Sequence, residues 1–215
     1  MNTRQASHWP SAQLTKDFFS LGTLLYLQFF LVYGGTNCLA AQSQNHYQVF
    51  FNWELSSPFI ALFIYPYLSL SLFVILPLFY IQPQQLRSWV LSYMWLTFAA
   101  GAVFIILPTE LAITRTISPD NTALIQYLFS LLYAFDQPHN LFPSLHIAYT
   151  TLALLIIISR RRINIWLWLI ISWWLLMLIS VLLIQQHYLA DIAAGLLLAI
   201  VCYYYCYAAL IIKNK

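Results

Sequence analysis

Long apolar stretches alternate with short polar segments along almost the whole chain. We interpret six of them as transmembrane helices, because a helix needs roughly 20 apolar residues to cross about 30 Å of hydrocarbon. They are Phe18–Ala41, Pro58–Ile81, Trp89–Leu107, Leu145–Ser159, Ile163–Ile184 and Tyr188–Ile212. The fourth is short, and we expect it to extend toward Arg160. The pattern predicts an all-α integral membrane bundle of six transmembrane helices, in which residues 1–215 form a single domain.

Two further segments show weaker patterns. Leu124–Phe135 is apolar but too short to span a membrane, so we expect an interfacial or re-entrant helix there. Gln42–Ser57 mixes aromatic and amide side chains, which suits an interfacial helix. Pro58, Pro66 and Pro77 predict kinks in the second transmembrane helix.

The composition agrees with a membrane protein. Hydrophobic residues make up 62% of the chain and charged residues 7%, and the mean hydropathy of +0.75 excludes an ordinary water-soluble domain. The eight Trp and fifteen Tyr fit interfacial belts. No basic stripe accompanies these aromatic residues, so no nucleic-acid partner is expected.

The N-terminal stretch and the cysteines add little chemistry. Cys38–Ala40 offers small residues for signal cleavage, but the preceding apolar run is longer than a signal peptide requires, which favours an uncleaved helix. Cys38, Cys202 and Cys206 form neither a disulfide framework nor a zinc spacing. We interpret them as small buried side chains.

Charge placement predicts the orientation of the bundle. If six helices cross the membrane, eight of the nine Lys and Arg residues fall on one face: Arg4, Lys16, Arg87, Arg160, Arg161, Arg162, Lys213 and Lys215. Cationic residues in short loops stay on the cytoplasmic side, so the N- and C-termini are both expected to be cytoplasmic. We interpret the three consecutive arginines as topology markers, with a site for anionic lipid as the alternative.

The opposite face carries most of the remaining ionisable groups. Five of the six acids and four of the five histidines lie on or near it, with Arg115 as its one cation. The candidate chemistry is therefore predicted at the extracytoplasmic face. Short loops and the positive-inside bias favour a bacterial inner membrane, with the site facing the periplasm.

His187 and Asp191 are four residues apart, which places both on one face of a helix. The carboxylate of Asp191 is then able to accept a hydrogen bond from one imidazole nitrogen and leave the other nitrogen free. A histidine nucleophile held by an orienting acid has this arrangement. The alternative is a structural His–Asp pair at a helix end.

A helix start precedes the fourth apolar stretch, in LFPSLHIAYTT at residues 141–151. Pro143 is expected at or just before the first helical position, with Ser144 and His146 in the first turn. Free backbone amides and the positive end of the helix dipole favour an anion there, and a phosphate oxygen suits such a site. The alternative makes Ser144 only an N-cap and His146 an interfacial residue.

Four more polar residues lie in the long segment before this helix. Arg115 supplies a permanent cation whose fork matches phosphate oxygens, with a solvated loop residue as the alternative. His139, in DQPHN, is a candidate to contribute to phosphate binding or a plain loop residue. Glu110 and Asp136 are expected to face water, with binding of an acceptor as the alternative.

An arginine, then P-S-x-H, then S-x6-H-x3-D resembles the type 2 phosphatidic acid phosphatase superfamily in order and in membrane placement, over roughly Pro108 to Gly195. By this resemblance, the matching residues are Arg115 in the first signature, Pro143, Ser144 and His146 in the second, and Ser180, His187 and Asp191 in the third. The resemblance implies a six-helix bundle, no metal and no other cofactor, and a phosphohistidine intermediate.

The chain departs from the family signatures at four positions. Pro108 and Thr116 replace the lysine and proline of the first signature, Leu145 replaces the glycine of the second, and Val181 replaces the arginine of the third. Two phosphate-binding cations are therefore missing. F-P-S-L-H with Q-H-Y-x-x-D-x-x-x-G looks more like the branch that includes inositol phosphorylceramide synthases and their bacterial relatives. In that branch, a phosphorylated headgroup can pass to an alcohol.

Residues and resemblance together predict a metal-independent lipid phosphatase. We expect His187 to attack phosphorus while Asp191 orients it, and His146 to protonate the leaving oxygen. The predicted phosphate-binding residues are Arg115, Ser144, Ser180 and His139. The expected substrate is a phosphate monoester or diphosphate of a membrane lipid. The alternative is a lipid headgroup phosphotransferase, with an acceptor lipid or alcohol as a second partner.

Two other classes remain as alternatives. A non-catalytic binder or transporter that keeps the phosphate site fits the loss of two cations. A metal or haem site made by His139, His146, His187 and Asp191 is the other, although no short metal-ligand spacing supports it.

Overall fold

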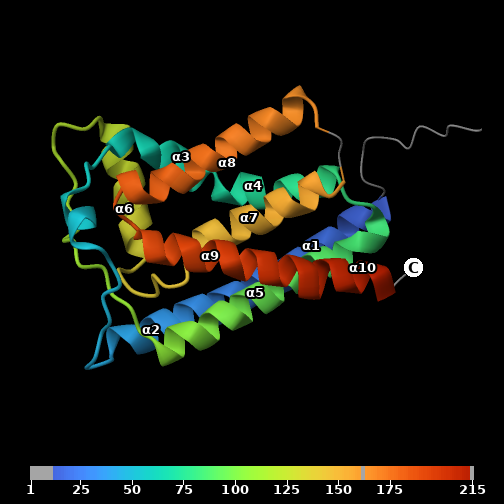
Figure 1. The fold of residues 1–215 in the computed structure, drawn as a ribbon, viewed down its shortest axis with the longest axis horizontal. Coiled ribbons are helices and arrows are strands. Elements are labelled where there is room, and N and C mark those ends of the chain that lie inside the picture. The colour runs from blue at the N-terminus through green and yellow to red at the C-terminus, as the bar shows by residue number, and fades with distance from the viewer. Residues whose placement is uncertain (1–11, 161–162, 214–215) are drawn as a thin grey trace, which may run out of the picture.

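The computed structural model describes residues 12–160 and 163–213. Its regular structure is helical (Figure 1), which confirms the all-α prediction. Two isolated β-bridges, Tyr47 with Thr109 and Glu110 with His139, connect loops at one end of the bundle.

The first two transmembrane stretches are interrupted helices. The first consists of α1 (Ala12–Phe29), the π-helical turn η1 (Phe30–Gly34) and α2 (Gly35–Ala41). The second consists of η3 (Ala61–Phe63), α3 (Ile64–Leu68), α4 (Leu70–Ile75) and the 3₁₀ turn η4 (Leu76–Phe79). Because proline lacks an amide hydrogen, it interrupts the ladder of helical hydrogen bonds. The predicted irregularities are found near Pro66, just before α3 ends, and at Pro77, in the first turn of η4.

The later helices follow the apolar pattern closely. They are α5 (Leu86–Ile106), preceded by η5 (Pro83–Gln85), then α6 (Ala123–Phe135), α7 (Leu145–Ile158), α8 (Ile165–Leu183), α9 (Leu189–Cys202), the π-helical turn η6 (Tyr203–Ala208) and α10 (Ala209–Lys213). Among the described residues, five helical runs are long and apolar enough to cross a membrane: Phe19–Ala41, Ala61–Phe79, Pro83–Ile106, Ile165–Leu183 and Leu189–Ile212. The protein is therefore an integral membrane protein.

The fourth predicted span, α7, is not one of these five runs. It has 14 residues, and at 1.5 Å per residue it extends about 21 Å, less than the hydrocarbon thickness of about 30 Å. Nearly all of its side chains are buried, and it packs against α4, α5, α8 and α9. The structure therefore supports five spans and a buried central helix, and a sixth crossing by α7 remains a prediction.

The described chain begins and ends at the same end of the bundle (Figure 1). Lys16 in α1, Arg87 in α5 and Arg160 after α7 belong to the element ends found there. Four other residues used to predict the orientation lie outside the described ranges: Arg4, Arg161, Arg162 and Lys215. Which membrane face this end occupies remains a prediction.

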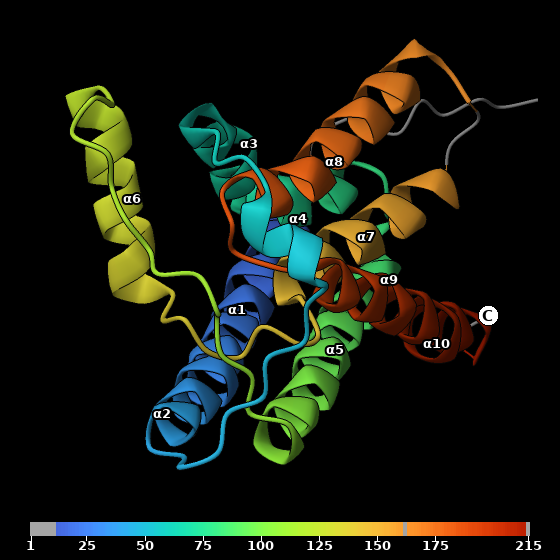
Figure 2. The ribbon, with the colours of Figure 1, turned by 60° about the vertical axis from the view of Figure 1, so that its left-hand side comes forward.

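The opposite end of the bundle carries the long loops and α6, which lies across the other helices (Figures 1 and 2). The predicted short helix at Leu124–Phe135 is confirmed as α6. The predicted interfacial helix at Gln42–Ser57 is wrong, because only the five-residue 3₁₀ helix η2 (Asn52–Ser56) forms there. The backbone of Tyr47 bonds instead to Pro108 and Glu110, with N···O distances of 2.9 and 3.0 Å.

Buried Glu54 fastens this loop to α9. One carboxylate oxygen accepts a hydrogen bond from the amide of Leu189, the first residue of α9, at 2.7 Å. The other accepts one from the amide of Phe51, also at 2.7 Å. The negative charge thus lies at the positive end of a helix dipole, where it is stabilising. Glu54 is one of the acids that the sequence places on the outer face, and its role as a clamp had no sequence signal.

Candidate active site

The first turns of α7 and α9 are in backbone contact. The amide of Ser144 donates to the carbonyl oxygen of Asp191 at 3.1 Å. At Gly195, a Cβ atom would lie 2.6 Å from the carbonyl oxygen of Ser144 and 3.3 Å from the Cβ of Ile147. Only glycine allows this approach, because any side chain would overlap with backbone. The contact brings the segment before α9, which carries His187, against the first turn of α7, which carries His146.

Asp191 lies beside His187, as predicted, but the two do not share a helix face, because α9 begins at Leu189 and His187 precedes it. The two atoms nearest to each other, Oδ2 of Asp191 and Nδ1 of His187, are 3.5 Å apart. Oδ2 also accepts a hydrogen bond from the amide of Tyr188 at 2.8 Å, so the carboxylate caps α9. Asp191 is 1% exposed, and a carboxylate this deeply buried needs such partners to remain charged. Neither Nδ1 of His187 nor Oδ1 of Asp191 has a well-formed hydrogen bond.

The ring of His146 is held by a tyrosine. The rings of His146 and Tyr67 are stacked, with centroids 4.1 Å apart and an interplanar angle of 21°. The imidazole is almost fully buried, and its Nε2 has no hydrogen-bond partner. An unpartnered buried nitrogen costs free energy, so its retention is a feature expected of a site that binds something.

His146 and His187 line one cavity of about 500 Å³. Its other polar lining residues include Tyr33, Tyr67, Asp136 and Asn140. Most of the remaining lining is apolar and comes from α1, η1, α3, α4, α6 and α7: Phe29, Phe30, Leu68, Leu70, Leu132, Phe135 and Leu145. The size and the mixture of apolar walls with a few converging polar groups are typical of a ligand site.

Asp136 lines this cavity and is partly exposed. The hydroxyl of Tyr33 donates to one of its carboxylate oxygens, and the hydroxyl of Tyr67 donates to the other at 3.2 Å. The two tyrosines hold its side chain toward the cavity, and the expectation that Asp136 faces water remains a prediction, because the residue is partly exposed. Tyr67 connects the two kinds of group in the cavity, since its ring contacts His146 and its hydroxyl contacts Asp136.

Asn140 completes this group. It has a left-handed backbone conformation, with φ of 58°, which asparagine tolerates better than most residues. Its side-chain nitrogen donates to the hydroxyl of Thr36 at 2.9 Å and to the carbonyl of Tyr33 at 3.3 Å. Its side chain is buried, and its Oδ1 has no partner.

Arg115 is placed on the loop side of Asp136. Its guanidinium donates to the backbone carbonyl of Asp136 and lies over the ring of Tyr133, 5.0 Å from the centroid. It lines a small separate pocket with Gln185 and Gln186, and not the cavity of the two histidines. Its Nε is buried without a partner.

The other predicted phosphate-binding residues are distributed over three places. Ser144 lies at the start of α7, where its hydroxyl caps the helix by accepting from the amide of Ile147 at 3.4 Å. Ser180 is fully buried in α8, and its hydroxyl donates to the carbonyl of Met177 at 2.6 Å. Neither residue is part of the cavity lining.

His139 belongs to a cluster in the outer loops. Its ring stacks on that of His46, with centroids 5.2 Å apart, and Nδ1 of His46 is 3.4 Å from a carboxylate oxygen of Glu110. Burial lowers the pKa of His139, and Glu110 opposes this by raising it. His139 does not line the cavity of His146 and His187. The structure thus brings together His146, His187 and Asp191, with Ser144 beside them, and places His139, Arg115 and Ser180 elsewhere.

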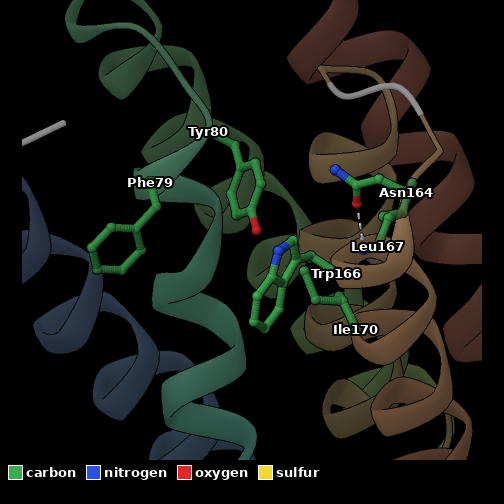
Figure 3. Close-up of a pocket in the computed structure, with 6 residues that line it drawn as sticks. All are labelled: Phe79, Tyr80, Asn164, Trp166, Leu167 and Ile170. Atoms are coloured by element: carbon green, nitrogen blue, oxygen red, sulfur yellow. Dashed lines mark hydrogen bonds between the residues drawn. The ribbon is translucent and has the colours of Figure 1, made fainter. Parts of the chain in front are cut away.

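The chain has another pocket at the opposite end of the bundle (Figure 3). It measures about 280 Å³ and is lined by Phe79, Tyr80, Asn164, Trp166, Leu167 and Ile170. Asn164 is used as the N-cap of α8, because its Oδ1 accepts from the amide of Leu167 at 2.9 Å. These six lining residues include no imidazole or carboxylate, so the pocket offers no candidate chemistry.

Three residues of the cavity were not predicted from the sequence as site residues: Tyr33, Tyr67 and Asn140. The two tyrosines occur among many others in apolar helices, where nothing in the local pattern distinguishes them. For Asn140, the polar segment DQPHN immediately before the helix start was an available signal. Among the described residues, no group of three or more His, Cys, Asp and Glu side chains is arranged to hold a metal ion.

The structure is an all-α membrane bundle in which two imidazoles line one cavity and an aspartate lies against one of them. These features define a candidate membrane enzyme whose reacting groups are histidines. A family model described as the PAP2 superfamily matches residues 39–205. The chain belongs to this superfamily, which confirms the resemblance found from its motifs. Membership implies phosphatase-type activity on phosphate monoesters. Comparisons with curated proteins and with solved structures found no match.

Proposed function

We propose that this protein is a metal-independent lipid phosphatase that hydrolyses a phosphate monoester or diphosphate of a membrane lipid through a phosphohistidine. The observation that supports this proposal most is the shared cavity of His146 and His187, together with the carboxylate of Asp191 at 3.5 Å from Nδ1 of His187. Two imidazoles and one carboxylate are sufficient for a two-step transfer, in which one histidine is the nucleophile and the other moves protons.

In the first step, His187 attacks phosphorus. Asp191, next to Nδ1, favours the tautomer that carries its proton on Nδ1 and its lone pair on Nε2, and stabilises the positive charge that develops. A P–N bond forms as the P–O bond to the lipid breaks. His146 gives its proton to the leaving oxygen, so the lipid departs as an alcohol. The stacked ring of Tyr67 fixes the plane of His146 for this transfer.

In the second step, His146 removes a proton from water, and the oxygen attacks phosphorus. The P–N bond breaks, which releases phosphate and regenerates His187. Because most of the stabilisation in phosphoryl transfer is electrostatic, the oxygens of the transferred group need donors. Leu145 and His146 open α7 and line the cavity, and the first amides of a helix lack partners within the helix. We assign the phosphate oxygens to these amides, and contributions from Arg115, Ser144, Ser180 and His139 rest on the family match or on the residue pattern.

The walls of the cavity suit a lipid. Three of its lining residues, Tyr26, Phe30 and Phe135, are 60%, 59% and 79% exposed. In a protein with spans of this apolarity, exposed aromatic side chains contact acyl chains and not water. We therefore propose that the lipid reaches the site sideways, past the α1–η1 segment and α6. The charge pattern supports a site on the extracytoplasmic face, at the periplasmic side of a bacterial inner membrane.

The test uses the purified protein in lipid nanodiscs with phosphatidate as substrate and excess EDTA. Wild-type protein releases inorganic phosphate, and His187→Ala reduces the rate by at least about a thousandfold, as expected for removal of a nucleophile. His46→Ala is the matched control, because it removes an imidazole from the outer loops and none from the cavity. A rate for His187→Ala close to that of the wild type contradicts the proposal. So does loss of activity with EDTA that added divalent metal restores.

The covalent step has its own measurement. His146→Ala is expected to slow the second step, so a ³²P-labelled lipid phosphate leaves an alkali-stable, acid-labile label on the protein. The double variant His146→Ala with His187→Ala takes up no label. Equal labelling of the two variants contradicts a phosphohistidine at His187.

The second candidate function is transfer of the phosphoryl group to an alcohol. It is favoured by one observation, the presence of Asp136 and its hydrogen-bonded tyrosines in the same cavity as the imidazoles. His146 alone is enough to activate water, so hydrolysis needs no further carboxylate. An alcohol, in contrast, also needs groups that bind and orient it.

A further inference from the structure

The hydrogen-bond donors around Asp136 are already engaged in bonds to neighbouring protein groups. Both tyrosine hydroxyls, those of Tyr33 and Tyr67, donate to the carboxylate. The side-chain nitrogen of Asn140 donates to Thr36 and to the carbonyl of Tyr33. What these groups still offer to the cavity are acceptors: the remaining lone pairs of Asp136, the two phenol oxygens and Oδ1 of Asn140.

The carbonyl oxygen of Asn140 is the most informative of these acceptors. The residue is 2% exposed and lines the cavity, and its Oδ1 has no hydrogen-bond partner. A buried, unpartnered acceptor is unfavourable unless a ligand satisfies it. The matching ligand group is therefore a hydrogen-bond donor. A phosphate oxygen accepts hydrogen bonds and carries negative charge, so this part of the cavity repels it.

The local charge distinguishes between the two donor groups that a lipid offers, a hydroxyl and an ammonium. Arg115 donates to the backbone carbonyl of Asp136, so a permanent cation lies near this residue, on its loop side and outside the cavity. Two phenol hydroxyls also stabilise the negative charge. With the carboxylate compensated in this way, an ammonium gains little by burial, because a buried cation needs an uncompensated partner. A neutral hydroxyl carries no such desolvation cost.

We propose that Asp136, Asn140, Tyr33 and Tyr67 form a subsite that binds a hydroxyl group next to the phosphoryl group on the histidines. Tyr67 sets the distance between the subsite and the histidines, because its ring stacks on His146 while its hydroxyl donates to Asp136. The hydroxyl belongs either to the lipid phosphate itself or to a separate alcohol. The subsite follows from its own hydrogen bonds, and only its position beside a phosphoryl group rests on the proposed function.

A separate alcohol in this subsite is the acceptor of the second step. Its O–H proton passes to His146, its oxygen forms the new P–O bond, and the P–N bond to His187 breaks. The products are an alkyl phosphate and free His187. A hydroxyl of the lipid phosphate in the same subsite instead selects for lipids that carry a free hydroxyl near the phosphate.

Binding without turnover tests the subsite directly. The probe is monoacylglycerol, which has two free hydroxyls and no phosphate, compared with its dimethyl ether, and native mass spectrometry of the detergent-solubilised protein measures both. Wild-type protein is expected to prefer the diol by about tenfold, the size of a charge-assisted hydrogen bond. Asp136→Asn loses most of this preference, although its backbone carbonyl still accepts from Arg115. Tyr33→Phe loses about threefold, the size of a neutral hydrogen bond.

The control is Asp120→Asn, which removes an exposed acid from the outer loops and is expected to keep the full preference. An equal affinity of the wild type for the diol and its ether overturns the subsite. So does a preference that survives in both Asp136→Asn and Tyr33→Phe. If tetramethylammonium competes for the subsite and monoacylglycerol does not, the proposal is also overturned, in favour of a cation site. These outcomes do not depend on phosphate release, so they are distinct from failure of the proposed phosphatase activity.

Two turnover measurements then distinguish the sources of the hydroxyl. In the first, lysophosphatidate is compared with an analogue that has hydrogen in place of the sn-2 hydroxyl. The ratio of kcat/KM for lysophosphatidate to kcat/KM for the analogue is measured in both proteins. If this ratio is about tenfold lower in Asp136→Asn than in the wild type, the hydroxyl in the subsite belongs to the lipid phosphate. In the second, glycerol is added to the phosphatidate reaction, and ³¹P NMR compares glycerol phosphate with inorganic phosphate. A transfer-to-hydrolysis ratio that falls by a similar factor in Asp136→Asn assigns it to an acceptor alcohol. If Asp136→Asn changes neither ratio in an active enzyme, the proposal is wrong.

Discussion

The two sides of the cavity are built in different ways. On the imidazole side, His146 and His187 are carried by segments whose backbones touch, with the amide of Ser144 on the carbonyl of Asp191 and no room for a side chain at Gly195. On the carboxylate side, Asp136 is held by hydroxyl groups from two other parts of the chain. Backbone contacts between helices leave little freedom, whereas side-chain hydrogen bonds change with a single substitution.

This difference indicates how a common reaction and a variable specificity are combined in one cavity. A 1 Å displacement of reacting groups can cost about a hundredfold in rate, so the nucleophile and the acid–base group need rigid supports. A group that selects a substrate needs only the right chemistry at the right place. We therefore expect substitutions on the imidazole side to lower kcat, and substitutions on the carboxylate side to change which substrate is preferred.

The largest expected effect is that of Asp191→Asn. The amide oxygen is still able to accept from the amide of Tyr188, so α9 keeps its cap. The charge beside Nδ1 of His187 is lost, and with it the preferred tautomer and the stabilisation of the imidazolium. Phosphate release is expected to fall by about 10³ to 10⁴, the loss seen when the orienting acid of a catalytic histidine becomes an amide. Initial rates measure it, with Asp120→Asn as the charge control. A loss below tenfold means that the pair is structural.

Gly195→Ala tests the helix contact without touching a reacting group. The new Cβ would lie 2.6 Å from a backbone oxygen, so α7 and α9 are forced apart. We expect a destabilisation of about 1–3 kcal/mol from overpacking and a rate about 10 to 100 times lower from the displaced imidazoles. Thermal unfolding in detergent and kcat are measured together. Gly22→Ala is the control, because a Cβ there meets nothing within 4 Å. An unchanged kcat in Gly195→Ala argues that the crossing does not position the histidines.

The imidazole side was largely predictable because it depends on local rules. A Pro-Ser pair before an apolar run predicts the capped start of α7. A spacing of four residues keeps His187 and Asp191 close together, although His187 precedes α9 and the predicted shared helix face does not form. Helix boundaries followed the apolar pattern to within a few residues for the same reason. The close approach at Gly195 was visible only as one glycine in a helix, since its packing partner lies in another helix.

The carboxylate side could not be predicted because its partners are far apart in the sequence. Tyr33 and Asp136 are separated by 103 residues, and Tyr67 and Asp136 by 69. No local pattern encodes such contacts. The long loops show the same limit, because tertiary hydrogen bonds to Tyr47 replaced the expected helix at Gln42–Ser57. Arg115 was predicted as a phosphate ligand from its charge, whereas its position depends on the carbonyl that it binds.

Tyr67 belongs to both sides of the cavity, so two substitutions of it separate them. Tyr67→Phe keeps a ring against His146 and removes the hydroxyl from Asp136, and we expect a loss of about threefold in the preference for a hydroxyl-bearing lipid. Tyr67→Ala also removes the ring, and a further decrease of about tenfold is expected in kcat, because stacking and burial no longer hold the imidazole. Steady-state kinetics with lysophosphatidate and its deoxy analogue measure both. If Tyr67→Phe lowers kcat as much as Tyr67→Ala does, the hydroxyl and not the ring supports the reaction.

Ser180→Ala is the smallest change and tests whether α8 belongs to the imidazole side. The family signature aligns Ser180 with a phosphate-binding position, but its hydroxyl donates to Met177 within the same helix and its side chain is fully buried. A hydroxyl already committed to a backbone carbonyl has no hydrogen left for a phosphate oxygen. We therefore expect kcat/KM to change by less than about twofold, since an intrahelical serine bond contributes little to stability or geometry. A tenfold loss in kcat/KM with unchanged thermal stability would instead mean that the hydroxyl turns toward the substrate during the reaction. The first amides of α7 would then share the phosphate with α8, and the imidazole side would extend over three helices.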